Sequence, residues 1–208
     1  MPRWITLEHY VEYAQMLLTM EGMVERVIND DAEEVIYLLE HQDVYTAGSG
    51  YTVSDLLSDD INIVHTGRGG KVTYHGPGQR IIYPILNLLK PNRKKDLKLY
   101  INMLQYWIIQ TLSHFSIKAY TRNDHIGIWT IDSDNNESKI ASIGIRVRKW
   151  VTYHGIAVNI DNDLSKFNHI IPCGIRNVKN ISLKQLGVNV AFAEFDLVLK
   201  ATFYKIFN

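Results

Sequence analysis

The chain lacks the features that would tie it to an oxidising compartment, nucleic acid or a membrane. Its 208 residues include one cysteine, Cys173, which excludes an intrachain disulfide and leaves a thiol for packing or chemistry. Lysine and arginine total 22, as do aspartate and glutamate, so the basic field typical of nucleic-acid binders is missing. No apolar run approaches the roughly 18 residues of a membrane span. Residues 1–10 show no secretory signal pattern, and we expect a cytoplasmic protein.

The length and the apolar pattern predict a single α+β domain over residues 1–208. A chain of this size still fits one hydrophobic core. Apolar residues at steps of three and four predict helices over residues 6–29, 96–115 and 195–207. Stretches rich in strand formers predict strands over residues 35–39, 127–131, 140–148 and 151–160. Because short turns join the middle strands, we expect a mixed or antiparallel sheet flanked by helices.

Two further expectations concern the region before residue 80. Residues 41–50 carry Thr46, Gly48 and Gly50, a composition that indicates a loop. Residues 61–65 and 71–75 surround the glycine-rich stretch 67–70, which predicts a hairpin of two strands with a flexible tip.

The pentapeptide Val-Thr-Tyr-His-Gly occurs twice, at residues 72–76 and 151–155. Two copies suggest one site built from two segments. In an extended segment Val and Tyr would share one face and Thr and His the other, and the final glycine would let another backbone come close. The alternative is a chance match between common strand formers.

Residues 68–79 combine four glycines, one proline, two cations and a histidine. Glycines let backbone N–H groups approach a ligand, and adjacent cations favour an anion. The spacing matches neither a P-loop nor the dinucleotide fingerprint. A hairpin turn followed by a second tight turn is the alternative interpretation.

A second candidate is the Pro-Cys-Gly corner at residues 172–174, where Cys173 could act as a nucleophile. A reactive thiol needs a nearby cation or base, for which Lys139, His75 and His154 are candidates. The alternatives are an inert buried cysteine and a merely solvated lysine. The acidic loop at 132–138 lacks the glycine and glutamate of a calcium loop, and the histidines and Cys173 are too scattered for a zinc site, so we expect no metal.

Four blocks, taken together, resemble the lipoyl(octanoyl) transferase family. They are Arg-Gly-Gly-Lys-Val-Thr-Tyr-His-Gly-Pro-Gly-Gln at 68–79, Lys-Ile-Ala-Ser-Ile-Gly at 139–144, His-Gly-Ile-Ala-Val-Asn at 154–159 and Pro-Cys-Gly at 172–174. The resemblance implies the fold of biotin and lipoate protein ligases. It also implies transfer of octanoyl from octanoyl-acyl-carrier protein to a lysine on lipoyl domains of 2-oxoacid dehydrogenases and the glycine cleavage H protein. No cofactor, ATP, metal, nucleic acid or membrane is implied.

The resemblance also assigns roles by position. It makes Cys173 the acyl-thioester nucleophile and Lys139 the group that lowers the pKa of this thiol and serves as a base. His154 is a supporting residue. The implied substrate-binding residues are Arg68, Gly69, Gly70, Lys71, Val72, Thr73, Tyr74, His75, Ser142, Ile143, Gly144, Gly155, Ile156 and Ala157.

Two rival interpretations remain. An ATP-dependent lipoate or biotin protein ligase on the same fold would activate a free acid and need no cysteine. A non-catalytic module binding an acyl group or a carrier protein would need neither Cys173 nor Lys139. Residues 75–79 and 172–174 favour a transferase over a ligase, and the presence of both reactive side chains argues against a binding module.

Overall fold

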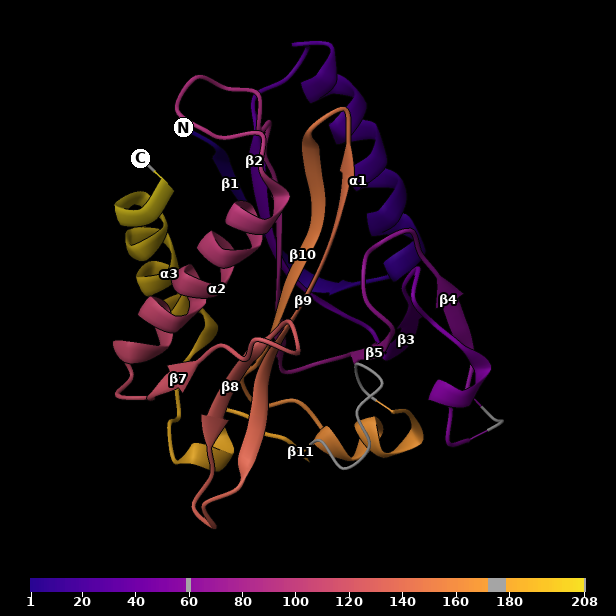
Figure 1. The fold of residues 1–208 in the computed structure, drawn as a ribbon, viewed down its shortest axis with the longest axis vertical. Helices are drawn as coiled ribbons and strands as arrows, with labels where there is room; N and C mark the ends of the chain where they lie inside the picture. The colour runs from indigo at the N-terminus through magenta and orange to yellow at the C-terminus, as the bar shows by residue number, and fades with distance from the viewer. Residues whose placement is uncertain (59–60, 172–178, 208) are drawn as a thin grey trace.

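The computed structural model describes residues 1–58, 61–171 and 179–207, which form two β-sheets and three α-helices (Figure 1). The larger sheet has the strand order β1-β2-β6-β10-β9-β8-β7, and β11 also pairs with β9. Its strands are β1 (Arg3–Val11), β2 (Val35–His41), β6 (Gln79–Ile85), β7 (Ala119–Tyr120), β8 (Ile128–Ile131), β9 (Glu137–Arg148), β10 (Val151–Asn159) and β11 (Lys179–Asn180). β1 and β11 pair in parallel with their neighbours and the other pairs are antiparallel. The mixed sheet of an α+β fold is therefore confirmed.

The smaller sheet has the order β4-β3-β5, from β3 (Val44–Ala47), β4 (Ile63–His65) and β5 (Val72–His75). Three short 3-10 helices, η1 (Val53–Asp55), η2 (Leu164–His169) and η4 (Lys184–Leu186), lie in connecting segments. Val72 and Tyr74 of β5 pack against Phe167 of η2, which fixes the smaller sheet to that segment.

The helices cover both faces of the larger sheet. Figure 1 shows α2 (Leu97–Ser113) and α3 (Phe192–Phe207) together on one face and α1 (Tyr13–Ile28) on the other. The face under α1 buries Met16, Met20 and Val24, which recur at helical spacing. The opposite core contains Trp107 of α2 and Phe203 of α3, whose rings lie 5.1 Å apart in an edge-on arrangement.

Several predicted elements are confirmed with small shifts. The second helix begins after Asp96, whose carboxylate caps the helix by accepting from the Leu99 N–H at 2.9 Å. The C-terminal helix begins at Phe192, three residues before the predicted start. The three middle strands form the expected antiparallel run β8-β9-β10. None of the helices within the described ranges is long and apolar enough to cross a membrane.

The prediction of a helix from residue 6 is wrong at its start, because residues 6–11 belong to strand β1. β1 pairs in parallel with β2, placing Arg3 opposite Val35 and Thr6 opposite Leu38. This pairing is between segments separated by the whole of α1, and the local spacing of Tyr10 and Tyr13 happened to fit a helix. The helix itself begins at Tyr13.

The predicted hairpin of residues 61–65 and 71–75 is also wrong. β4 and β5 both pair with β3, which lies between them. β3 falls in the segment predicted as a loop, where the glycines at 48 and 50 follow a four-residue strand directly. So short a strand leaves too few residues for its alternation to be recognised.

Candidate active site

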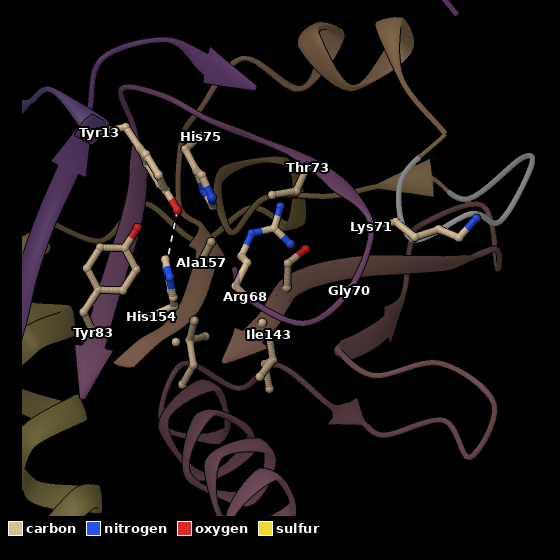
Figure 2. Close-up of a pocket in the computed structure, with 14 residues that line it drawn as sticks. Tyr13, Arg68, Gly70, Lys71, Thr73, His75, Tyr83, Ile143, His154 and Ala157 are labelled. Carbon is tan, nitrogen blue, oxygen red and sulfur yellow. Dashed lines mark hydrogen bonds between the residues drawn. The ribbon is translucent and has the colours of Figure 1, made fainter. Parts of the chain in front are cut away.

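A pocket lies where the two sheets meet, with β9 and β10 as its floor. Ser142, Ile143 and Gly144 of β9 pair there with Ala157, Ile156 and Gly155 of β10. The space measures about 470 Å³, its open mouth included. It is lined by Tyr13, Arg68, Gly70, Lys71, Thr73, His75, Tyr83, Ser142, Ile143, Gly144, His154, Gly155, Ile156 and Ala157 (Figure 2).

Two glycines allow the pocket walls to come close to the floor. A Cβ at Gly144 would lie 2.9 Å from the carbonyl oxygen of Gly69, whose N–H donates to the Ile145 carbonyl at 2.8 Å. A Cβ at Gly155 would lie 2.3 Å from the Ile82 carbonyl oxygen on β6. A side chain at either position would therefore push neighbouring backbone away. This confirms that the second pentapeptide's glycine permits a close backbone approach.

The guanidinium of Arg68 is buried in one pocket wall. One of its nitrogens donates to the carbonyl and the hydroxyl of Thr46 at 2.7 and 2.8 Å, and another donates to the Gly69 carbonyl at 3.0 Å. These bonds hold Arg68 to β3 and to its own turn. The arginine thus shapes the wall and contributes a fixed positive charge.

Tyrosine and histidine side chains form one end of the pocket, as Figure 2 shows for Tyr13, His75, Tyr83 and His154. The Tyr13 hydroxyl lies 3.3 Å from Nδ1 of His154, and the Tyr13 and His75 rings stack with centroids 6.1 Å apart. Behind them, His41 Nε2 lies 2.9 Å from the Tyr83 hydroxyl. We call Tyr13, His75, Tyr83 and His154 the end wall.

Burial keeps these groups uncharged near neutral pH. It lowers the pKa of His154 to about 3 and that of His41 to about 4, because an imidazolium would lose its hydration there. The pKa of His75 also falls well below its usual value, chiefly through burial. Burial raises the pKa of Tyr13 to about 12, against the opposing effect of the nearby Arg68 charge.

A β-bulge sets the direction of Lys139. Ile128 pairs with Ala141 and Trp129 with Lys139, so Ile140 is an extra residue on β9. Ile140 and Ala141 both join the core under α2 and α3. The bulge therefore turns Lys139 to the opposite face of β9, which also carries Ser142 of the pocket floor.

The Lys139 side chain is enclosed, with only 1% of the residue exposed. Its Nζ lies 5.6 Å from the centre of the Trp129 ring, and a Cβ added at Gly127 would lie 2.4 Å from its Cε. Its carbonyl accepts from the Ile181 N–H at 3.0 Å, next to β11. β11 itself pairs with residues 138 and 139, so residues 179 and 180 lie beside the lysine.

Cys173 lies outside the described residues, and its pairing with Lys139 stays a prediction.

The structure brings together most of the residues that the sequence suggested for substrate binding. Both pentapeptide copies contribute, through Thr73 and His75 in one and His154 and Gly155 in the other. Val72 and Tyr74 instead pack away from the pocket in the core beside η2, as strand alternation requires. Gly69 is not among the lining residues, and its N–H bonds to the Ile145 carbonyl of β9. That these side chains bind substrate stays a prediction.

Sequence reasoning missed two lining residues. Tyr13 falls within the helix predicted over residues 6–29, and Tyr83 lies in the apolar stretch of residues 81–89, for which the sequence suggests no chemistry. Neither belongs to a motif. Only the packing of α1 and β6 against β10 brings them to the pocket.

Residues 12–204 match the lipoyl protein ligase A/B catalytic domain. The octanoyltransferase of Rickettsia prowazekii is 56% identical over 209 residues, covering 100% of both chains. The chain belongs to the octanoyltransferase family. This confirms the resemblance on which the sequence interpretation rested, and with it an enzyme of the acyltransferase class.

Solved structures of related fold agree with the architecture. A chain from the structure of a bi-partite lipoate protein ligase and its E2 lipoyl domain from Thermoplasma acidophilum has a TM-score of 0.74 at 14% identity, covering 99% of this chain and 83% of that one. A biotin protein ligase from Aquifex aeolicus in complex with biotin and ATP has a TM-score of 0.61 at 12% identity, covering 100% and 71%. At such low identity these structures show the shared fold alone. They do not separate transferase from ligase chemistry, whereas the octanoyltransferase relative is similar over its full length.

Proposed function

We propose that this octanoyltransferase-family protein moves an octanoyl group from octanoyl-acyl-carrier protein to the ε-amine of a lysine on a lipoyl domain, through a thioester on Cys173. The observation that carries this proposal is the enclosed Lys139, turned by the β9 bulge onto the strand face that carries the pocket floor. Lipoyl domains of 2-oxoacid dehydrogenases and the glycine cleavage H protein are the proposed acceptors. The single cysteine suits a reducing compartment such as the cytoplasm.

The proposed reaction has two acyl transfers. The Cys173 thiolate attacks the carbonyl carbon of the octanoyl thioester, and the carrier thiol leaves with a proton. The acceptor amine then attacks the new thioester, loses a proton, and regenerates the Cys173 thiol as the amide forms. Each step exchanges one acyl bond for another, so neither ATP nor metal is required.

Lys139 has a role in both steps. As an ammonium it would favour the thiolate by charge. It can give its proton to the departing carrier thiolate in the first step, and the neutral amine that remains can accept the proton that the incoming amine loses in the second. Backbone N–H groups of the glycine-rich segment are candidates for holding the oxyanion that develops in each step, except that of Gly69, which already donates to the Ile145 carbonyl. Residues 68–75, 142–144 and 155–157 are the proposed substrate-binding segments.

The rival function is that of an ATP-dependent lipoate or biotin ligase. Incubation with octanoyl-acyl-carrier protein in the absence of ATP, followed by intact mass measurement, separates the two. The proposal expects one octanoyl adduct on the wild-type enzyme and none on Cys173→Ser, whose hydroxyl is not ionised at neutral pH. A ligase would give no adduct without ATP, and a binding module would give none under either condition.

A further inference from the structure

The end wall lies farther along the β9–β10 ladder than Lys139, which is not itself among the residues that line the pocket. Along β9 the pocket residues Ser142 and Gly144 follow Lys139, and the next residue, Ile145, pairs with His154 of β10. An acyl group attached near Lys139 would therefore extend over the floor toward His154. From the Ser142 pair to the His154 pair the strands advance by roughly 10 Å, which is comparable to an extended eight-carbon chain.

Side chains from separate elements close this end. Tyr13 comes from the first turn of α1, Tyr83 from β6 and His154 from β10. Tyr13 and His154 are 3% and 1% exposed, so both rings are packed inside the protein at this end of the pocket. The 3.3 Å contact between the Tyr13 hydroxyl and His154 Nδ1 joins the two rings across the end.

His154 reaches this position through an unusual backbone conformation. Its φ is +55°, a left-handed value that is strained for a non-glycine residue. The residue still pairs with Ile145 within the β9–β10 ladder. Its Nε2 has no hydrogen-bond partner among the described residues, although the atom is buried. Such strain at a pocket residue indicates a functional constraint on where the ring lies.

We infer that Tyr13 and His154 close the acyl pocket and set the length of acyl chain that the enzyme accepts. This inference rests on the proposed function, since it requires an acyl group bound with its carbonyl near Lys139. An octanoyl chain fills the space up to the two rings. A decanoyl chain meets them and has to bend or displace them.

Two substitutions open the end in different ways. His154→Asn shortens the side chain and keeps a residue type that adopts left-handed backbone readily. Tyr13→Leu removes the hydroxyl and the far part of the ring from the α1 side. Tyr100→Phe is the matched control, because Tyr100 is equally buried but comes from α2, where it faces the core and lies 3.2 Å from the Thr152 hydroxyl.

The test compares rates of thioester formation with octanoyl- and decanoyl-acyl-carrier protein for each variant. The ratio of the two rates within one preparation does not depend on how much enzyme is folded. We expect the decanoyl-to-octanoyl ratio to rise by about tenfold in His154→Asn and Tyr13→Leu, since two more methylenes are accommodated. Tyr100→Phe should keep the wild-type ratio.

The outcomes separate the two proposals. A raised ratio in both end-wall variants supports the assignment. An adduct on wild-type enzyme with an unchanged ratio in both variants would overturn the assignment and leave the transfer reaction standing. Absence of any octanoyl adduct on the wild-type enzyme would overturn the proposed function and, with it, this inference.

Discussion

The proposed reaction requires Lys139 to lie close enough to Cys173 to lower the pKa of its thiol. A thiolate close to the Lys139 ammonium would be stabilised by its positive charge, because the enclosed site screens that charge less than water does. The lysine's place on β9 is described by the structure, and its effect on Cys173 can be measured.

Lys139→Met should make the Cys173 thiol harder to ionise. Removing one nearby positive charge should raise the midpoint of thiol alkylation rate against pH by about one to three units. The exposed Lys94, replaced by methionine, is the control and should leave the midpoint in place. An unchanged midpoint in Lys139→Met would contradict the pairing of Lys139 with the cysteine.

Gly127→Ala should disturb the same lysine without removing it. The new methyl group would lie 2.4 Å from Lys139 Cε and 3.0 Å from the Ala141 carbonyl oxygen, and Gly127 has a φ of +149°, so both the lysine side chain and the local backbone have to move. We expect octanoyl-thioester formation to slow by about tenfold, the cost of roughly 1.4 kcal/mol of lost alignment, and the alkylation midpoint to shift as in Lys139→Met. Gly22→Ala is the control, because a Cβ there meets no atom within 4 Å. If Gly127→Ala changes neither rate nor midpoint, Gly127 has no positioning role.

At the scale of elements, the β9–β10 hairpin carries most of the pocket floor. It turns through Lys149 and Trp150, with φ values of +45° and +68°, as a two-residue turn with left-handed central residues requires. Asparagine suits the first of these positions better than lysine.

Lys149→Asn should therefore raise the free energy of unfolding by about 0.5–1 kcal/mol, through relief of the left-handed strain. Urea denaturation would measure the change. Lys94→Asn, an exposed change outside this turn, should alter the stability by less than about 0.5 kcal/mol. A loss of stability in Lys149→Asn would mean that the lysine side chain contributes more than its backbone strain costs.

The elements that were predictable from sequence are those defined by local spacing. Helix α2 and strands β8, β9 and β10 repeat their apolar residues regularly and turn back over short connections. β1 and β3 were missed because their partners lie far along the chain. The partner of β1 follows α1, and both partners of β3 follow residues 48–62. The bulge at Ile140 was equally hidden, since it exists only relative to β8.

At the scale of the whole molecule, the packing of α1 and the two sheets forms the end wall, and no sequence motif predicted its two tyrosines. The pentapeptide repeat and the glycine-rich stretch predicted much of the pocket, because their histidines and glycines are unusual in any strand. Tyr13 and Tyr83 look like ordinary core residues until the elements meet. The single domain over residues 1–208 stays a prediction.

The same packing makes stability depend on pH. His41, His75 and His154 are held uncharged in the folded protein, whereas in the unfolded chain a histidine titrates near pH 6.5. Below that pH the unfolded chain binds protons that the folded protein does not. The free energy of unfolding should fall by up to about 1.4 kcal/mol per pH unit for each histidine, down to about pH 4 for His41.

Urea denaturation between pH 7 and pH 5 would measure this slope. His41→Gln removes one of the three groups while leaving an amide that can hydrogen-bond, so its average slope over this range should be smaller by about 1 kcal/mol per pH unit. Equal slopes for the two proteins would show that His41 is not held neutral by the fold.

In the proposed reaction the octanoyl group is bound to Cys173 before it reaches the acceptor lysine. A chase experiment measures this transfer. The enzyme is acylated with octanoyl-acyl-carrier protein, purified, and mixed with a lipoyl domain without ATP. The masses of both intact proteins and of their peptides are then followed over time by mass spectrometry. We predict that the octanoyl group leaves Cys173 as an equal amount arrives on one lysine of the lipoyl domain. An acyl group found elsewhere on the enzyme, or one that reaches the lipoyl domain only when ATP is added, would contradict it.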